Sequence, residues 1–90
     1  MDFLKNNWQY IEQSANCRAL EIAEITRRFG DLDDFRQEIY LWVVRRAPDY
    51  NTKRGNATTF IAMTTATAKK RILRRLRRLK NRIIQDAMSI

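Results

Sequence analysis

The sequence has no histidine, one cysteine, one proline and two glycines among its 90 residues. Without histidine, and with Cys17 as the single thiol, the chain offers no ligand set for a structural zinc ion and cannot form an internal disulfide bond. This composition fits a reduced, cytoplasmic setting, and we expect Cys17 to be a small buried side chain. The scarcity of glycine and proline, with 44% apolar residues, predicts one small all-α domain over residues 1–90.

Long apolar runs and catalytic motifs are missing too. No run approaches the roughly 18 apolar residues that a membrane span requires, so we expect no membrane partner. The sequence shows no glycine-rich phosphate loop and no spacing that would place a nucleophile beside a base. Acids are too sparse in the basic half of the chain for a two-metal centre. We therefore expect a protein that is not an enzyme and needs no metal or cofactor.

Charge is distributed unevenly along the chain. Residues 1–50 contain seven Lys and Arg against nine Asp and Glu, a net charge of −2. Residues 51–90 contain eleven Lys and Arg against one acid, a net charge of +10. This asymmetry predicts a polyanionic partner for the second half of the chain.

Hydrophobic spacing predicts two helices in the first third of the chain, over residues 2–14 and 16–29. Asn16 is a candidate N-cap of the second helix, and Gly30 is expected to stop it. The expected inner faces hold Phe3, Leu4, Trp8 and Ile11 in the first helix, and Leu20, Ala23, Ile25 and Phe29 in the second.

Two further helices are predicted, which makes a bundle of about four. The third has Asp31 and Asp33 as candidate N-caps and runs to about Ala47, where Pro48 ends it. A loop of turn-forming residues follows. No glycine or proline interrupts residues 57–87, which we expect to form one long helix.

A rotation of about 100° per residue divides the third helix into two faces. The core face is expected to hold Phe35, Ile39, Trp42 and Val43. The opposite side holds Asp34, Gln37, Glu38, Leu41 and Val44. That side is either a solvated face, with acids near a helix N-terminus where they suit the dipole, or a small interface with an apolar centre and a polar rim.

The same rotation separates two faces on the long fourth helix. A stripe that we expect to be buried holds Ile61, Thr65, Ala68, Ile72, Leu76, Leu79 and Ile83. The opposite face holds Thr59, Phe60, Met63, Thr67, Lys70, Arg71, Arg74, Arg77, Arg78 and Arg82.

The basic face of this helix favours contact with phosphates. Residues 69–82 carry nine Lys and Arg and no acid, which is excessive for a solubilising surface, where mixed signs are usual. The start of the face is apolar and hydroxylic, and it could hold an unstacked base beside a phosphate backbone. A helix lying on an anionic membrane is the weaker alternative, because its apolar side usually carries Trp or Phe.

Over roughly residues 17–78, the chain resembles region 2 of the bacterial sigma-70 family of RNA polymerase sigma factors. In that family an Asp-x-x-Gln-Glu motif opens a helix. An aromatic residue and an Arg-Gly turn follow. A long helix then begins with Thr and an aromatic residue and ends in Arg. The turn spacing is similar to the extracytoplasmic-function branch. The matching residues are Asp34, Gln37 and Glu38, then Tyr50, Arg54 and Gly55, then Thr59 and Phe60.

The resemblance implies two binding surfaces and a role in transcription initiation. The family docks its Asp-Gln-Glu helix on the clamp helices of the polymerase β′ subunit and captures flipped bases of the promoter −10 element. The implied polymerase-binding residues are Asp34, Gln37, Glu38, Leu41 and Val44. The implied DNA-binding residues are Tyr50, Arg54, Thr59, Phe60, Met63, Thr64 and Thr67, with Lys69, Lys70, Arg71, Arg74, Arg75 and Arg78 on phosphates.

The chain departs from the family pattern in ways that bear on this function. Met63 and Thr64 stand where housekeeping members carry a Trp pair that wedges the duplex open, and Ala57 stands where an aromatic is common. The domain that reads the −35 element (region 4) has no counterpart in the sequence. We therefore expect a truncated sigma-like factor, such as a minimal phage or mobile-element specificity factor, or one completed by a second protein.

Two other functions remain open from the sequence. One is a regulator that binds RNA polymerase without recognising promoters independently. The other is a general basic nucleic-acid-binding domain with no polymerase partner. The tail, residues 81–90, either folds back against the first helix as core, which we favour, or presents a docking surface for a partner.

Overall fold

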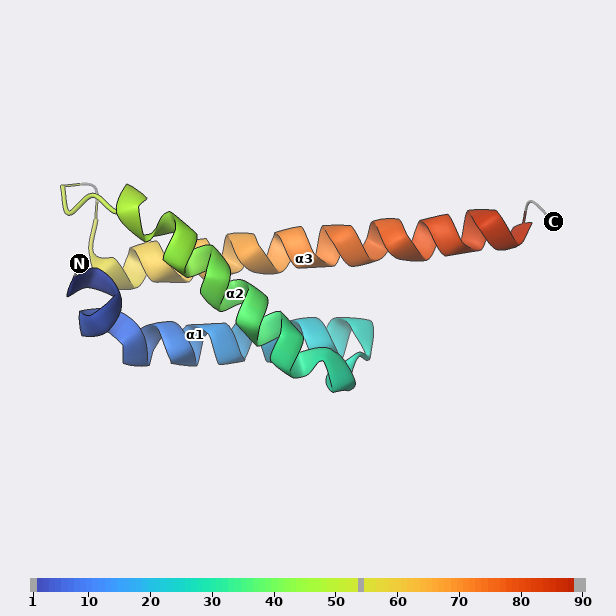
Figure 1. Ribbon diagram of the computed structural model, residues 1–90, viewed down its shortest axis with the longest axis horizontal. Coiled ribbons are helices and arrows are strands. Elements are labelled where there is room, and N and C mark those ends of the chain that lie inside the picture. The colour runs from blue at the N-terminus through green and yellow to red at the C-terminus, as the bar shows by residue number, and fades with distance from the viewer. Residues whose placement is uncertain (1, 54, 89–90) are drawn as a thin grey trace.

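The computed structural model describes the backbone of residues 2–53 and 55–88, and the side chains of residues 3–53 and 55–82. The described chain is all-helical. It consists of α1 (Asp2–Thr26), the short 3-10 helix η1 (Phe29–Asp31), α2 (Leu32–Arg46), the 3-10 helix η2 (Ala47–Asp49) and α3 (Ala57–Met88). The α-helices α1 and α3 lie side by side, and α2 crosses both (Figure 1). The all-α prediction is confirmed, but three α-helices are found in the described chain where about four were expected.

The break that we expected between residues 14 and 16 is absent, because α1 is one continuous helix of 25 residues. No glycine or proline interrupts it, and its buried seam, formed by Ile11, Ala15, Ala19, Ile22 and Ala23, recurs at helical spacing through the expected break. Asn16 therefore caps nothing. Its side-chain oxygen instead accepts a hydrogen bond of 3.2 Å from Arg36 on α2.

Four apolar side chains that we expected inside in the first two predicted helices are exposed: Trp8 by 43%, Leu20 by 47%, Ile25 by 62% and Phe29 by 52%. Cys17, also expected to be buried, is exposed. The inner seam of α1 is formed by isoleucines and small alanines, and the larger side chains on α1 lie outside it, whereas Phe29 lies beyond α1, in η1.

The end of α1 is made by Arg27 and not by Gly30. Arg27 has a φ of 58°, and the N–H of Arg28 donates a 3.1 Å hydrogen bond to the carbonyl of Ala23, which is the pattern of a Schellman motif. Asp31 occupies the N-cap position of α2, but its carboxylate pairs with Arg28 at 3.4 Å and makes no cap bond. The carboxylate of Asp33 likewise pairs with Arg36.

The other helix boundaries follow from local chemistry. Pro48 lies in η2, directly after α2, as predicted. Before α3, the side-chain oxygen of Asn56 accepts a 2.8 Å hydrogen bond from the backbone N–H of Thr59, which is N-cap geometry. The long helix then runs without interruption to Met88.

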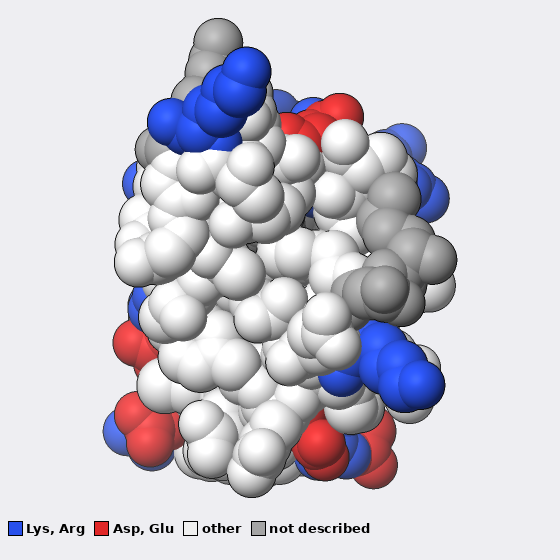
Figure 2. Space-filling view, turned by 90° about the vertical axis from the view of Figure 1, so that its left-hand side faces the viewer, with Lys and Arg blue, Asp and Glu red and all other residues white. Residues whose placement is uncertain are grey.

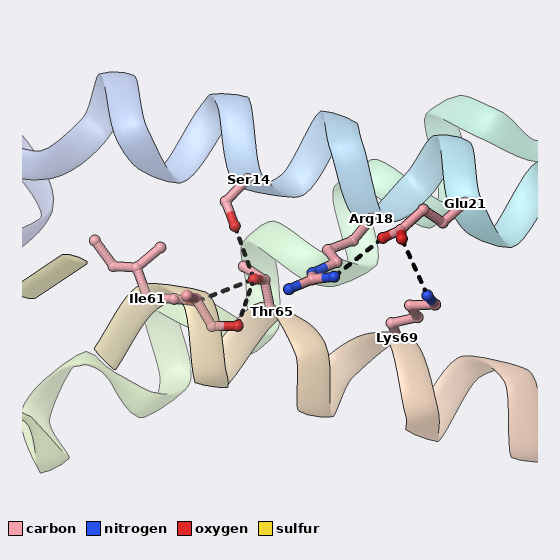
Figure 3. A network of polar contacts seen from close by, with 7 residues as sticks. Ser14, Arg18, Glu21, Ile61, Thr65 and Lys69 are labelled. Atoms are coloured by element: carbon pink, nitrogen blue, oxygen red, sulfur yellow. Dashed lines mark hydrogen bonds and ion pairs between the residues drawn. The ribbon is translucent and has the colours of Figure 1, made fainter. Parts of the chain in front are cut away.

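The core lies where the three helices meet. Phe35, Ile39 and Val43 of α2 are buried there with the seam of α1. From α3 come Ile61, Thr65, Ala68 and Ile72, the first part of the predicted stripe. The hydroxyl of the fully buried Thr65 bonds to the carbonyls of Ile61 (3.0 Å) and Ala62 (3.1 Å) and meets the Ser14 hydroxyl of α1 at 2.8 Å (Figure 3).

The predicted apolar stripe of α3 is no longer buried toward the end of the helix. Leu76 packs at the edge of the core, Leu79 is 46% exposed, and Ile83 lies outside the side chains that the structure describes. The backbone of α3 continues straight past the ends of the other two helices (Figure 1). The expectation that residues 81–90 fold back against the first helix is therefore wrong for the described part, residues 81–88, because nothing interrupts the helix.

Candidate protein and nucleic-acid interface

The outer face of α2 carries an apolar centre with polar side chains around it. Leu41 is 64% exposed and Val44 45% exposed, although the opposite side of the same helix is buried in the core. Asp34 and Gln37 are exposed beside them, and Glu38 is half-buried. The structure thus brings together all five residues predicted to bind polymerase, and we name this set the α2 patch.

One residue of the α2 patch reaches toward α3. The carboxylate oxygen Oε1 of Glu38 lies 2.5 Å from a guanidinium nitrogen of Arg75. The second oxygen, Oε2, is buried and has no hydrogen-bond partner in the described structure. The ion pair therefore links the predicted protein-binding surface to the predicted phosphate-binding surface.

The basic residues of α3 mostly face solvent. Lys70, Arg71, Arg74, Arg77, Arg78 and Arg82 are all exposed, as the helical rotation predicts, and Arg75 is exposed despite its ion pair. Arg54, also predicted to contact DNA, lies outside the described residues.

Lys69 differs from the other predicted phosphate ligands because it faces α1. Its ammonium lies 3.3 Å from the carboxylate of Glu21, which Arg18 also contacts at 3.1 Å (Figure 3). The pKa of Glu21 is below its ordinary value of 4.5. Burial alone would raise that pKa, but the hydrogen bonds and positive charges of Arg18 and Lys69 together lower it further. Lys69 thus joins two helices and is not part of the exposed basic face.

Aromatic side chains gather where α3 begins. The ring of Tyr50 lies 5.3 Å from that of Phe60, and Phe3 of α1 lies 4.8 Å from Tyr50 and 5.7 Å from Phe60, measured between centroids. The Tyr50 hydroxyl donates to the carbonyl of Gly55 at 3.2 Å. The two aromatics predicted to meet DNA bases therefore also support the fold at this end of the molecule.

The surface around the start of α3 carries little charge. Figure 2 views the molecule from this end, and uncharged side chains cover most of its middle while Lys, Arg, Asp and Glu lie around the edge. Thr59, Met63 and Thr67 are exposed here, and Met63 is exposed by 67%. Thr64 is only 8% exposed, and its hydroxyl donates to the carbonyl of Phe60, so little of it is accessible to a ligand.

A groove between α2 and α3 joins the two predicted surfaces. Its volume is about 510 Å³, and we name it the arginine groove. Its walls are Glu38, Leu41, Trp42, Arg45, Ala68, Arg71, Ile72, Arg74, Arg75 and Arg78. A smaller apolar hollow of about 330 Å³ shares Trp42 and is otherwise lined by Arg46, Asp49, Phe60, Met63, Thr64 and Thr67.

Sequence reasoning missed three residues of these hollows. Trp42 was placed on the core face, but it is only half-buried and lines both hollows. The guanidinium carbons of Arg71 and Arg46 lie 4.3 and 4.7 Å from the centre of a Trp42 ring. Arg45 and Arg46 had no assigned role, although the spacing from Trp42 to Arg46, one helical turn, is a signal for such a cation–π contact.

Comparison with known proteins identifies no relative: no family model, no curated protein and no solved structure matches the chain. Within the described chain, no helix is long and apolar enough to cross a membrane. Nor do the described residues contain a group of three or more Cys, Asp or Glu side chains placed to hold a metal ion.

Proposed function

We propose that the chain is a sigma-like transcription factor. It binds the β′ subunit of core RNA polymerase through the α2 patch and promoter −10-type DNA through α3, and so directs transcription initiation. The family resemblance over residues 17–78 suggests this function. The observation that carries it is the arginine groove, where Glu38 and Leu41 of the α2 patch lie against Arg71, Arg74, Arg75 and Arg78 of the basic face.

The composition of the α2 patch supports a protein partner. An exposed leucine and an exposed valine on one turn, with acids and an amide beside them, match the apolar centre and polar rim of a protein interface. A purely solvated face would gain nothing from exposing these two side chains.

The basic face supports a DNA partner. Its exposed arginines and lysine have no acidic neighbour within α3 over residues 57–82, and Arg75 alone among the exposed ones has an ion-pair partner in the described structure. Arginine presents a planar fork of donors that matches phosphate geometry. The neutral, hydroxylic start of α3 beside this face suits unpaired bases.

Retention of core RNA polymerase on the immobilised protein tests the docking half of the proposal. The variants are Asp34→Ala and Leu41→Asp, with Leu20→Asp as the matched control, because Leu20 is also an exposed leucine but lies on α1. We expect both α2 variants to lose polymerase and the control to retain it, with unchanged circular dichroism spectra. Polymerase retained by both α2 variants would refute docking through this surface.

Promoter dependence tests the DNA half. The complex of polymerase with this protein should bind a DNA library selectively, and the selected sequences should share a −10-type element. Recovery of DNA without sequence preference would mean that only the polymerase-binding half of the proposal stands. That result would favour the second candidate, a polymerase-binding regulator without independent promoter recognition.

One observation favours that second candidate. Tyr50 and Phe60 pack against Phe3, so base capture by these rings requires this aromatic cluster to open. A third candidate, a general basic nucleic-acid-binding domain, predicts that Asp34→Ala leaves all binding intact. The polymerase measurement above therefore distinguishes it from the other two.

A further inference from the structure

The last part of α3 extends beyond the other two helices. It continues past the ends of α1 and α2 (Figure 1), and the molecule measures 55 Å along its longest axis but only 23 and 17 Å across it. Leu76 still packs at the edge of the core, whereas Leu79, about one turn further on, is 46% exposed. We name residues 76–88 of α3 the overhang, and at 1.5 Å per residue it is about 18 Å long.

The apolar stripe of α3 keeps a regular spacing from the core into the overhang. Its residues follow one another at intervals of four, three and four: Ile72, Leu76, Leu79 and Ile83. This alternation is the a and d spacing of a coiled coil, and Asp86 at the next d position ends it. Ile72 is buried in the core cluster shared with α1 and α2. The overhang therefore repeats, outside the core, the pattern with which α3 packs on helices inside it.

The charges beside the stripe select the kind of partner. In a coiled coil the flanking e and g positions determine which helix is accepted. In the overhang these positions hold Lys80 and Arg82, both exposed, and Arg75 holds the preceding g position. A second copy of α3 would bring these cations against one another in a parallel or an antiparallel pair, so self-association is disfavoured. A helix with acids at its own e and g positions would form ion pairs with them instead.

The stripe also distinguishes a protein partner from a nucleic acid. Lys70 and Arg74 of the basic face lie on the opposite side of α3 from Leu79. Phosphates on that face leave Leu79 in water, whereas the apolar face of another helix would bury it. A protein helix on the stripe would in turn leave Lys70 and Arg74 accessible.

We infer that the overhang is a docking site for a helix of a second protein, one with apolar residues at a and d and Glu or Asp at e and g. Its apolar side chains cover Leu76 and Leu79, and its carboxylates pair with Lys80 and Arg82. This site goes beyond the proposed function and does not depend on it, because it uses neither the α2 patch nor the arginine groove's α2 wall.

Two synthetic peptides of about three heptads provide the probes. Both carry Ile at a and Leu at d, and they differ only at e and g, where the acidic peptide has Glu and the basic peptide has Lys. Binding to the full chain is measured by anisotropy of the labelled peptide. We expect the acidic peptide to bind and the basic peptide not to bind.

The contribution of the stripe is tested by Leu79→Gln. This variant should weaken binding of the acidic peptide about tenfold, because a buried leucine is lost from the interface. Leu20→Gln is the matched control, since Leu20 is a leucine of nearly equal exposure, 47%, on α1. It should not change the affinity, and both variants should keep the circular dichroism spectrum of the unaltered protein.

The contribution of the flanking charges is tested by charge reversal. Lys80→Glu combined with Arg82→Glu should reverse the preference, so that the basic peptide binds and the acidic peptide does not. Lys70→Glu combined with Arg74→Glu changes the net charge equally on the other side of α3 and should keep the preference for the acidic peptide.

Several results would overturn the inference. Absence of binding by the acidic peptide, unchanged affinity of Leu79→Gln, or equal binding of a polyglutamate peptide would show that the stripe receives no helix. A dimer of the chain alone that Leu79→Gln dissociates would assign the stripe to a second copy. Binding to anionic vesicles in place of the acidic peptide, lost in Leu79→Gln, would assign it to a membrane surface. Since neither polymerase nor DNA is present, failure here leaves the proposed function untouched.

Discussion

The ion pair between Glu38 and Arg75 leads to a prediction about how the two surfaces influence each other. Replacing Glu38 by Gln removes the charge that holds Arg75 across the groove. The two side chains are 39% and 53% exposed, so the pair contributes at most about 1 kcal/mol to the free energy of unfolding. The buried oxygen Oε2 has no partner, and removing the charge also reduces its desolvation cost. We expect E38Q to change the unfolding free energy by less than about 1 kcal/mol.

The effect on DNA binding should be larger. Arg75, once free of Glu38, can neutralise one more phosphate, and each phosphate contact to a single strand adds about 0.7 to the salt slope. At 0.1 M salt this corresponds to an affinity gain of about fivefold. Binding of polymerase should meanwhile weaken, because Glu38 belongs to the α2 patch.

The assay is anisotropy of labelled oligo(dT) between about 50 and 200 mM salt, with urea denaturation to measure stability. E24Q is the matched control, because Glu24 is an exposed acid on α1 and its loss changes the net charge equally. Equal gains in affinity for E38Q and E24Q would show that only net charge matters. No gain for E38Q would show that Arg75 is not restrained by Glu38, and either result would refute the reasoning.

Three further predictions concern the fold. Because the pKa of Glu21 lies below 4.5 in the folded state, its contribution to stability is present above pH 4.5 and is lost as the pH falls through the folded value. E21Q should therefore be less stable than the unaltered protein at pH 7, and the difference should shrink at pH 3 in urea denaturation. Ile39→Ala should lower the unfolding free energy by about 2–5 kcal/mol, because Ile39 is fully buried, whereas Leu20→Ala should have little effect. Asn56→Ala should cost about 1 kcal/mol by removing the N-cap of α3, and Asn56→Ser should restore most of it in thermal unfolding.

Part of the candidate site follows from helical rotation alone. The 100° step places Ile61, Thr65, Ala68 and Ile72 inside and the arginines of α3 outside, and the structure agrees on both. The same step places Leu41 and Val44 on the outer face of α2, where they are found. These predictions hold because each concerns one helix, and a helix presents its faces in the same order whatever its neighbours are.

Other features of the structure cannot be predicted from one helix considered alone. Leu20 and Ile25 are apolar, but a different face of α1, its alanine-rich seam, meets α2 and α3 and leaves them outside. Lys69 has the sequence context of a phosphate ligand, yet Glu21 of α1 lies opposite it. Both outcomes depend on which faces of two helices meet.

The sequence by itself therefore determined the helical class, the end of α2 just before Pro48, the uninterrupted α3 and its basic face, since propensity, turn chemistry and periodicity are local properties. Only the tertiary structure decided that Glu38 joins Arg75 and that Trp42 lies against both Arg46 and Arg71. These features depend on how α2 crosses α1 and α3, because side chains distant in the chain become neighbours only through that packing.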